Sequence, residues 1–423
     1  MKKAFLFFTF CSFFLSLLYP TRSDAGWIQT SVNIRMDTCL CLAVNGTNIF
    51  AGTYGGGVFL STDNGMSWTG VSTGLTDSLV NTLAVSPNGA GGANIFAGTE
   101  GGGVFLSTNN GTNWTAVNSG LTSSLIRALF VSGTNLYAGT EDDGAFLSTD
   151  NGTSWTAVDS GLTVNLVDAF AVNGTNLYAG TDGGAFLSTH NGTSWTDVSS
   201  GLTNLNVYAF AFSGASLYAG THGGGTFLST NDGTSWTNLT YDFNGNNPNV
   251  YAFAVSGTNL PAGQASLFAA TYGGVFLSTN NGTSWTAVSS GLSDASVNAL
   301  ALSGTNLFVG TEGSGVWKRP LSQMVTSVNQ APTGLPEKFA LYQNYPNPFN
   351  PTTEISYQLS AVSNVTLKIH DILGREVTAL VNEKQEPGSY SMTFDGSRLA
   401  SGLYFYRLVA GNYSATKRLV LMK

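Results

Sequence analysis

Basic residues are scarce over most of this 423-residue chain. Between Gly26 and Trp317 only Arg35 and Arg127 are basic, against thirteen aspartates and three glutamates. From Lys318 onward the balance reverses, with eleven bases against seven acids. A nucleic acid or an anionic membrane needs clustered lysine and arginine side chains to neutralise its charge. Both are therefore excluded as partners of the long acidic segment.

Cysteine and histidine are also rare, with three of each. Cys11 lies in an apolar N-terminal run, which leaves Cys39 and Cys41, and a disulfide between residues two positions apart is strained. A metal site needs a cluster of ligands, and the histidines form none with these cysteines: His190, His222 and His370. The sequence predicts two small buried thiols, no metal and no cofactor.

Long apolar runs are absent after the first 25 residues. Lys2 and Lys3 precede an apolar stretch over 4–18, and Ser23-Asp24-Ala25 fits the small-residue rule for signal cleavage. The stretch is too short for a convincing membrane span. Residues 1–25 are therefore predicted to be a signal peptide, with no transmembrane segment after its removal.

What the chain has in abundance is repetition. A unit containing Y-A-G-T, F-L-S-T and N-G-T-S-W recurs along the chain, and an aromatic residue in the same place marks each copy. Successive markers are 40 to 49 residues apart: Phe59, Phe105, Phe146, Phe186, Phe227, Phe276 and Trp317. Four short apolar runs per unit, separated by turn residues, are typical of a β-propeller blade.

The seventh unit lacks its fourth apolar run after Trp317. Trp27 and Trp68 both stand 15 residues before a Leu-Ala-Val run, so the segment 26–32 is predicted to supply the missing strand. Propellers close their ring in this way to protect strand edges. The fold predicted for 26–320 is thus a seven-bladed β-propeller closed by the N-terminal strand.

The rest of the chain differs in character. Prolines and polar residues over 321–338 predict a linker, and alternating runs over 339–423 predict a small Ig-like β-sandwich in an all-β protein. Four motifs occur in the latter segment: Tyr345-Pro346-Asn347-Pro348-Phe349-Asn350-Pro351, Asp371-Ile372-Leu373-Gly374-Arg375, Ser401-Gly402-Leu403-Tyr404 and Lys417-Arg418-Leu419-Val420.

These motifs resemble the C-terminal sorting domain of type IX secretion cargo. The resemblance implies export by the type IX secretion machinery across the outer membrane of a Bacteroidetes-type bacterium. The domain would then be cleaved, or exchanged for a surface anchor. The resemblance implies where the protein is exported and does not imply an activity. An ordinary Ig-like ligand-binding module is the alternative.

Six units contain a turn of the form Ser-x-Asp-x-Gly-x-x-Trp, with Asn or His in place of Asp in four of them. The complete copies are 61–68 and 148–155. The turn resembles the Asp-box, or BNR repeat, of sialidases, sortilin-like receptors and photosystem-assembly propellers. A short acceptor side chain binds turn amides, Gly adopts positive φ and Trp packs between blades. A structural role is therefore predicted, with cation or carbohydrate contact as the alternative.

Positions that vary between otherwise similar blades predict a binding site at one mouth of the central channel. One set follows the Gly-Thr pair that ends the second run: Tyr54, Glu100, Glu141, Asp182, His222, Tyr272 and Glu312. The other set lies at the start of the first run: Leu40, Asn81, Arg127, Asp168, Tyr208, Tyr251 and Asn298. Carboxylates and aromatic rings suit an extracellular glycan or a cationic peptide. A solvated rim without a ligand is the alternative.

The catalytic residues of similar propellers are incomplete here. Sialidases hold a substrate carboxylate with three arginines, and the predicted propeller has only Arg35 and Arg127. Xyloglucan hydrolases with Asp-boxes use a cleft between two propellers, and one is predicted here. A glycoside hydrolase that uses Asp168 with Glu141 or Asp142 stays open.

The sequence therefore predicts a secreted or cell-surface, non-catalytic recognition protein. Its propeller would bind an extracellular glycan or protein, and its C-terminal domain would direct its export. A structural or adhesive surface protein without a discrete ligand is the other alternative, because the blades are nearly identical.

Overall fold

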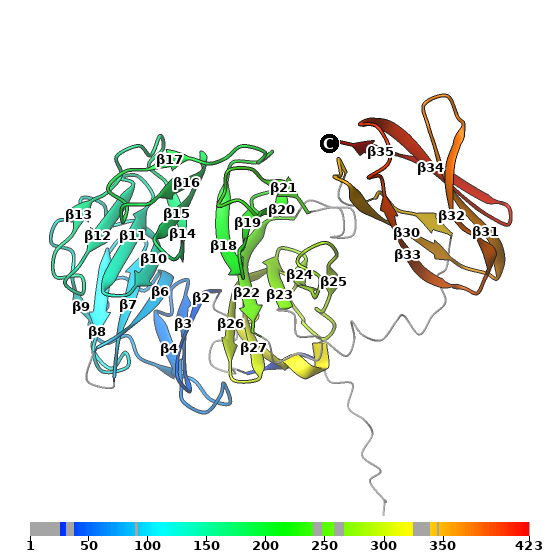
Figure 1. The fold of residues 1–423 in the computed structure, drawn as a ribbon. Helices are drawn as coiled ribbons and strands as arrows, with labels where there is room; N and C mark the ends of the chain where they lie inside the picture. The colour runs from blue at the N-terminus through cyan, green and yellow to red at the C-terminus, as the bar shows by residue number, and fades with distance from the viewer. Residues whose placement is uncertain are drawn as a thin grey trace, which may run out of the picture. The chain divides into compact units, whose positions relative to one another are not determined.

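The computed structural model describes residues 26–30, 38–88, 92–239, 248–257, 266–324, 339–344 and 347–422. The predicted signal peptide and most of the predicted linker lie outside the described residues, as do Arg35, Tyr345 and Pro346. The chain divides into two compact units, 1–328 and 329–423 (Figure 1).

The described part of the first unit contains seven antiparallel sheets of four strands each. The first three sheets are β2(Cys39–Asn45), β3(Asn48–Thr53), β4(Val58–Ser61) and β5(Thr69–Gly70); β6(Val80–Pro87), β7(Ala93–Thr99), β8(Val104–Ser107) and β9(Thr115–Ala116); and β10(Ile126–Ser132), β11(Asn135–Thr140), β12(Ala145–Ser148) and β13(Thr156–Ala157). The next three are β14(Val167–Asn173), β15(Asn176–Thr181), β16(Gly184–Ser188) and β17(Thr196–Asp197); β18(Val207–Ser213), β19(Ser216–Thr221), β20(Gly225–Ser229) and β21(Thr237–Asn238); and β22(Val250–Ser256), β23(Ser266–Thr271), β24(Gly274–Ser278) and β25(Thr286–Ala287). The seventh has the order β26(Val297–Ser303), β27(Asn306–Thr311), β28(Val316–Pro320) and β1(Ile28–Gln29).

The first strands of the seven sheets surround a common axis. Each contacts the first strand of the next sheet, from β2 through β6, β10, β14, β18 and β22 to β26, and β26 contacts β2. In Figure 1 the colour passes in chain order from blue at β2 through cyan and green to yellow at β27. The first unit is therefore the predicted seven-bladed propeller.

The last sheet takes its fourth strand from the opposite end of the unit. In β1, Ile28 lies opposite Lys318 and Gln29 lies opposite Trp317 of β28. The N-terminal strand therefore completes the seventh blade, as predicted. It is shorter than the predicted segment 26–32, of which residues 31 and 32 lie outside the described residues.

A tryptophan ahead of the fourth strand ties a blade to the preceding blade. The indole Nε1 of Trp195 donates a hydrogen bond to the carbonyl oxygen of Val158 at 2.7 Å. Trp27 makes the equivalent contact with the carbonyl oxygen of Val288, also at 2.7 Å. Arg319 donates from Nη1 to the same oxygen at 2.9 Å. Both ends of the propeller segment therefore meet at Val288.

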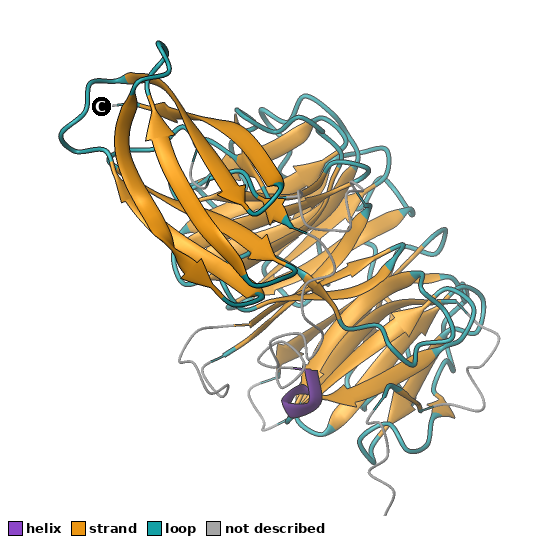
Figure 2. Ribbon diagram, turned by 90° about the vertical axis from the view of Figure 1, so that its right-hand side faces the viewer, coloured by secondary structure: helices purple, strands orange, loops and turns teal. Residues whose placement is uncertain are grey.

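The packed part of the propeller extends past the predicted boundary at residue 320. Residues 321–324 form a helical turn, drawn in purple in Figure 2. Leu321 and Met324 are buried in one cluster with Trp27 and Trp317. The predicted linker 321–338 is mostly polar residues and prolines, so the two apolar side chains near its start did not indicate packing against the propeller. The first residues of the predicted linker therefore pack against the propeller core.

A glycine in the second strand lets the next blade approach closely. A Cβ atom at Gly139 of β11 would lie 2.5 Å from the carbonyl oxygen of Val167 in the neighbouring blade. That distance is well inside van der Waals contact, and the neighbour is backbone, which cannot rotate away as a side chain can. The side chain at this position is therefore limited by the spacing between blades.

We expect Gly139→Ala to lower the free energy of unfolding by about 1–3 kcal/mol, because β14 must move to admit the methyl group. Gly70→Ala is the matched control, since its Cβ would lie 3.8 Å from Phe59, an ordinary contact. Denaturant unfolding of the two variants checks this expectation. Equal unfolding midpoints would show that the blades are not limited by this contact.

The Ser-x-Asp-x-Gly-x-x-Trp turns are held by their own side chains. In the first of them the Gly65 amide donates to Ser61 Oγ at 2.8 Å, and the Ser67 amide donates to Asp63 Oδ1 at 2.9 Å. Hydrogen bonds from Ser67 and then Ser61 lower the pKa of Asp63 to about 2. Gly65 has a positive φ of 79°, as predicted for the glycine of this turn. The preceding Asn64 also has a positive φ, of 59°. These contacts stay within the turn, as a structural role requires.

The second unit is a sandwich of two sheets, ordered β29-β30-β33 and β32-β31-β34-β35. Its strands are β29(Ala340–Leu341), β30(Thr352–Leu359), β31(Ser363–His370), β32(Glu376–Gln385), β33(Gly388–Asp395), β34(Gly402–Ala410) and β35(Tyr413–Leu421). Alternate residues of β30 and β31, such as Ile355, Tyr357 and Leu367, form a shared core. The alternating runs predicted over 339–423 correspond to strands of these sheets, although most side chains of β32 are exposed or half-buried.

Candidate functional site

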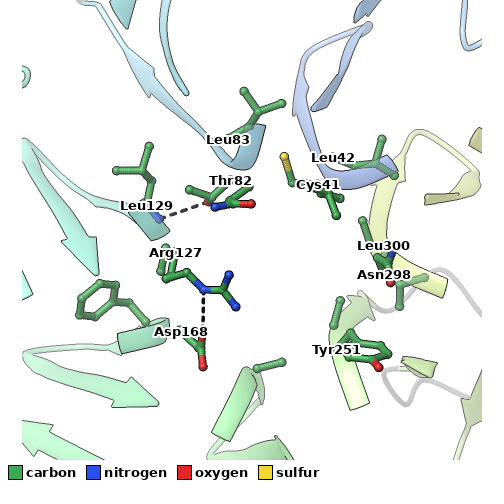
Figure 3. Close-up of a pocket in the computed structure, with 18 of the residues that line it drawn as sticks. Cys41, Leu42, Thr82, Leu83, Arg127, Leu129, Asp168, Tyr251, Asn298 and Leu300 are labelled. Atoms are coloured by element: carbon green, nitrogen blue, oxygen red, sulfur yellow. Dashed lines mark hydrogen bonds and ion pairs between the residues drawn. The ribbon is translucent and has the colours of Figure 1, made fainter. Parts of the chain in front are cut away.

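A cavity of about 340 Å³ lies where the first strands of all seven blades converge (Figure 3). Three successive positions of the first strands supply its lining. The first position lines the cavity in six blades, with a polar or aromatic residue in five of them; the second position is mostly alanine, and the third is leucine or phenylalanine. The cavity therefore combines directional polar groups with apolar walls. Its volume is at the low end of the range for small-molecule sites, about 300–1000 Å³.

The first lining position is a β-bulge in every blade. In β10, Ile126 lies opposite Thr140 and Ala128 opposite Gly139, so Arg127 between them has no partner across the strand pair. The same register shift occurs in each of the other first strands. The bulge residues are Leu40, Asn81, Arg127, Asp168, Tyr208, Tyr251 and Asn298. A bulge inserts one residue and redirects its side chain, so the predicted inner set is the set of bulge residues.

Arg127 and Asp168 extend from neighbouring strands, β10 and β14, and form an ion pair at the cavity (Figure 3). Arg127 Nε donates to Asp168 Oδ1 at 3.3 Å, and Arg127 Nη1 lies 4.0 Å from Glu100 Oε2. Asn81 Nδ2 donates to the same Glu100 oxygen at 2.6 Å. One side of the site is thus a linked set of charged and amide groups.

The Asp168 carboxylate is nearly buried, with 9% of its side chain exposed. Burial raises its pKa, and the neighbouring Arg127 opposes that shift without cancelling it. Asp182 and Glu141 raise the pKa further through their charges. These two residues of the outer set therefore act on the cavity electrostatically, although neither lines it.

The other side of the site is aromatic. The rings of Tyr208 and Tyr251 are stacked, with centroids 6.0 Å apart and planes at 15°. His222 meets Tyr208 edge-on at 5.6 Å, and Asn249 Nδ2 donates to the Tyr251 hydroxyl at 3.0 Å. Burial, followed by the charge of Asp168, raises the pKa of Tyr208. The aromatic and charged sides are therefore in electrostatic contact.

The outer set is fixed to the start of the neighbouring first strand by backbone hydrogen bonds. The amide of Glu100 donates to the carbonyl of Leu79 at 3.1 Å, and that of His222 donates to Asn206 at 3.0 Å. Tyr272 is 65% exposed and does not line the cavity. Of the predicted residues, Arg127, Asp168 and Tyr251 line the cavity. Behind this lining, Glu100 lies near Arg127, and Tyr208 contacts both Tyr251 and His222. Glu141 and Asp182 act on Asp168 through their charges, and Tyr272 lies apart.

Sequence reasoning missed the deeper lining residues. Cys41 and Thr82 occupy the second lining position, and Phe170 and Phe253 the third. The predicted site consists of positions that vary between blades. These deeper positions are almost uniform from blade to blade, so variation does not mark them. A search for small residues directly after the variable position could have found the second row.

The two cysteines are free, Cys39 buried and Cys41 half-buried. Burial raises the pKa of the Cys39 thiol to about 12 and also raises that of Cys41, so neither thiol has a reactive thiolate at neutral pH. Over the described residues, no group of histidine, cysteine and carboxylate side chains could hold a metal ion. Among the described residues, no helix is both long and apolar enough to cross a membrane.

The first C-terminal motif lies along the last strand of the second unit. Asn347 donates from Nδ2 to the Arg418 carbonyl at 3.2 Å and accepts from the Val420 amide at its Oδ1 at 2.8 Å. The Phe349 amide donates to the Val420 carbonyl at 2.9 Å. Pro348 stands between these contacts in sequence. The motif and the end of the chain are therefore one structural element.

The other motif residues have structural positions as well. Gly402 begins β34, and the Tyr404 hydroxyl donates to the Ala400 carbonyl at 2.9 Å. Lys417 of β35 lies opposite Tyr406. In the Asp371-Ile372-Leu373-Gly374-Arg375 turn, Asp371 accepts hydrogen bonds from the amides of Leu373 and Arg375. Many residues of these motifs thus have a structural role in turns and strands.

Residues 343–422 match the family described as the secretion system C-terminal sorting domain. The chain therefore carries a type IX sorting domain, and the protein is exported to the cell surface or the medium. No curated protein matches the chain significantly.

Solved structures similar to the chain are propeller proteins. PorZ, a surface component of the type-IX secretion system of Porphyromonas gingivalis, has a TM-score of 0.51 and 18% identity, over 90% of this chain and 59% of its own. The extracellular domain of BT3049, described as a hybrid two-component system of B. thetaiotaomicron, has a TM-score of 0.58 and 12% identity, over 93% and 56%. The GH74 xyloglucanase of Xanthomonas campestris has a TM-score of 0.55 and 16% identity, over 86% and 63%.

The chain spans somewhat more than half the length of each of these three structures. At these identities the likeness concerns the fold alone.

Proposed function

We propose that the exported propeller is a non-catalytic recognition module that binds an extracellular glycan in its axial cavity. The observation that carries this proposal is the convergence of six of the seven bulge residues, all except Tyr208, on one cavity. The bulge residues are the blade positions that differ, while the strands around them repeat. Ion-pair, amide and aromatic groups beside a small apolar pocket are the usual components of a sugar site.

Recognition accounts for the site better than catalysis does. Arg127 is the only arginine that lines the cavity among the described residues, which falls short of the three that sialidases use. The Asp168 carboxylate is engaged by Arg127 instead of standing free as an acid. The Ser-x-Asp-x-Gly-x-x-Trp turns make internal contacts, and we assign them, as Asp-boxes, to blade structure.

Binding to immobilised polysaccharides tests the proposal. The chain from residue 26 to 423 is expected to be retained on at least one bacterial or plant polysaccharide, and Tyr251→Ala is expected to weaken retention at least tenfold, because a stacked aromatic wall is lost. Tyr272→Ala is the matched control, since Tyr272 lies apart from the cavity. New reducing ends in the eluate would restore the hydrolase alternative. Retention on proteins alone would replace the glycan by a protein ligand.

A further inference from the structure

The ion pair in the cavity leaves one hydrogen-bond acceptor on Asp168 and the terminal donors of Arg127 available to a ligand. Asp168 has one hydrogen-bond partner within the described chain, the Nε of Arg127, through Oδ1. Its Oδ2 atom is therefore an unpaired acceptor on a side chain that is nine-tenths buried. Among the described residues, the terminal nitrogens of Arg127 approach only Glu100, at 4.0 Å, which exceeds hydrogen-bond distance. Open donors and an open acceptor thus stand side by side at the cavity (Figure 3).

A pair of adjacent hydroxyl groups satisfies both sides at once. A hydroxyl donates one hydrogen bond and accepts others, whereas an ammonium only donates and a carboxylate only accepts. One hydroxyl can accept from the guanidinium of Arg127 while its neighbour donates to Asp168 Oδ2. A ligand that meets both demands makes hydrogen bonds to two charged groups, whereas one that meets a single demand makes them to one, so the first has the advantage.

The charges around the pair disfavour an ionic ligand of either sign. A carboxylate or sulfate at Arg127 would lie near Glu100 and beside Asp168, whose carboxylate already experiences the charges of Glu141 and Asp182. An ammonium at Asp168 would lie beside the Arg127 guanidinium, 3.3 Å from the carboxylate. Like charges at such distances repel each other. A neutral ligand avoids both repulsions.

The rest of the cavity suits the body of a sugar. Tyr251 lines the cavity, and its ring is stacked on that of Tyr208 behind it, so the C–H face of a pyranose can pack against Tyr251. The alanines of the second lining row, such as Ala128 and Ala169, leave room beside the ion pair. The cavity of about 340 Å³ accommodates one sugar residue rather than a long segment of chain.

We infer that the cavity selects an electrically neutral sugar residue, whose adjacent hydroxyls bridge Arg127 and Asp168, and that it rejects acidic glycans and basic peptides. This inference rests on the proposed recognition function and adds the chemical class of the ligand. It assigns Arg127 and Asp168 as specificity-determining residues and Tyr251, supported by Tyr208, as the packing contact.

Calorimetric titration of the chain from residue 26 to 423 tests the inference. The probes are neutral gluco-, xylo-, manno- and galacto-oligosaccharides, an oligogalacturonate and an oligolysine. We expect binding of at least one neutral oligosaccharide and none of the charged probes. Asp168→Asn should weaken that binding about 10- to 100-fold, the size of a hydrogen bond to a charged group. Arg127→Lys, which keeps the charge but loses the fork, should weaken it about tenfold.

Asp63→Asn is the matched control for the acidic substitution. Three other turns of the same form carry asparagine at this position, Asn109, Asn231 and Asn280, and each of the three accepts the same amide hydrogen bond. Neutral sugar binding should therefore be unchanged in Asp63→Asn.

The melting temperature of Asp168→Asn should not fall, because a carboxyl whose folded pKa is raised destabilises the fold at neutral pH. If that variant nevertheless unfolds, Arg127→Lys carries the test.

The outcomes separate the two proposals. Binding of oligogalacturonate or oligolysine that is lost in Asp168→Asn would overturn the inference and leave recognition at this cavity intact. Neutral sugar binding that both cavity variants leave unchanged would also overturn it, because the ion pair would then have no part in selection. No binding of any probe or polysaccharide by the folded chain would overturn the proposed function itself.

Discussion

A chain that lacks residues 339–423 is expected to accumulate in the periplasm, whereas the full chain reaches the cell surface or the medium. The sorting-domain match covers 343–422, and this segment has its own core, which includes Ile355, Leu367 and Tyr406. Its removal should leave the propeller core intact, since that core is made of other residues. The expected loss of export is nearly complete, because the signal is removed as a whole.

Fractionation of a type IX-secreting host into cytoplasm, periplasm, outer membrane and medium, followed by immunoblotting, measures this effect. Arg127→Gln in the full chain is the control, because it changes the propeller cavity and leaves the sorting domain untouched. Asn347→Ala is a finer probe, since it removes two hydrogen bonds that hold the first motif on β35. Undiminished secretion of the truncated chain would mean that another part of the protein directs export.

Trp27→Ala is expected to lower the free energy of unfolding of the propeller by about 3–5 kcal/mol. Trp27 is 5% exposed, packs in one cluster with Trp317 and Met324, and donates to the Val288 carbonyl. The adjoining strand β1 has only two residues, so backbone pairing alone holds the N-terminal end weakly. Loss of the indole therefore removes a buried apolar side chain and one of the hydrogen bonds that hold the N-terminal end in the seventh blade.

Ile28→Ala is the matched control, because Ile28 lies in the same strand with 56% of its surface exposed and contributes little burial. Denaturant unfolding followed by tryptophan fluorescence gives the two midpoints, and limited proteolysis reports opening of the seventh blade. If both variants unfold at the same denaturant concentration, the ring is held closed by contacts other than Trp27.

The sequence predicted the propeller well because each blade repeats the same physical solution. Apolar runs, turn glycines and a tryptophan recur at nearly constant spacing, so an error in one blade is corrected by the other six. The N-terminal closure followed from the same spacing at Trp27. By contrast, the packing of 321–324 depends on Leu321 and Met324, two side chains in a segment that occurs once and offers no second copy for comparison.

The sequence predicted which positions belong to the candidate site, but not how their side chains are arranged in space. Variation between blades located Arg127, Asp168 and Tyr251, because side chains that share a cavity need not be alike. It could not reveal the bulge, since a one-residue register shift leaves no mark on composition. Nor could it separate Tyr272 from Tyr251, because both are variable aromatics and only the backbone decides which of them faces the axis.

The extra residue in each first strand has a consequence for how such a protein can change. A side chain that has no partner across its strand pair can be exchanged without disturbing the alternation that builds the blade core. The seven bulge positions therefore form a modular surface, in which ligand preference can be altered one blade at a time while the scaffold stays constant. A combinatorial library restricted to these seven positions would search new specificities on an unchanged framework.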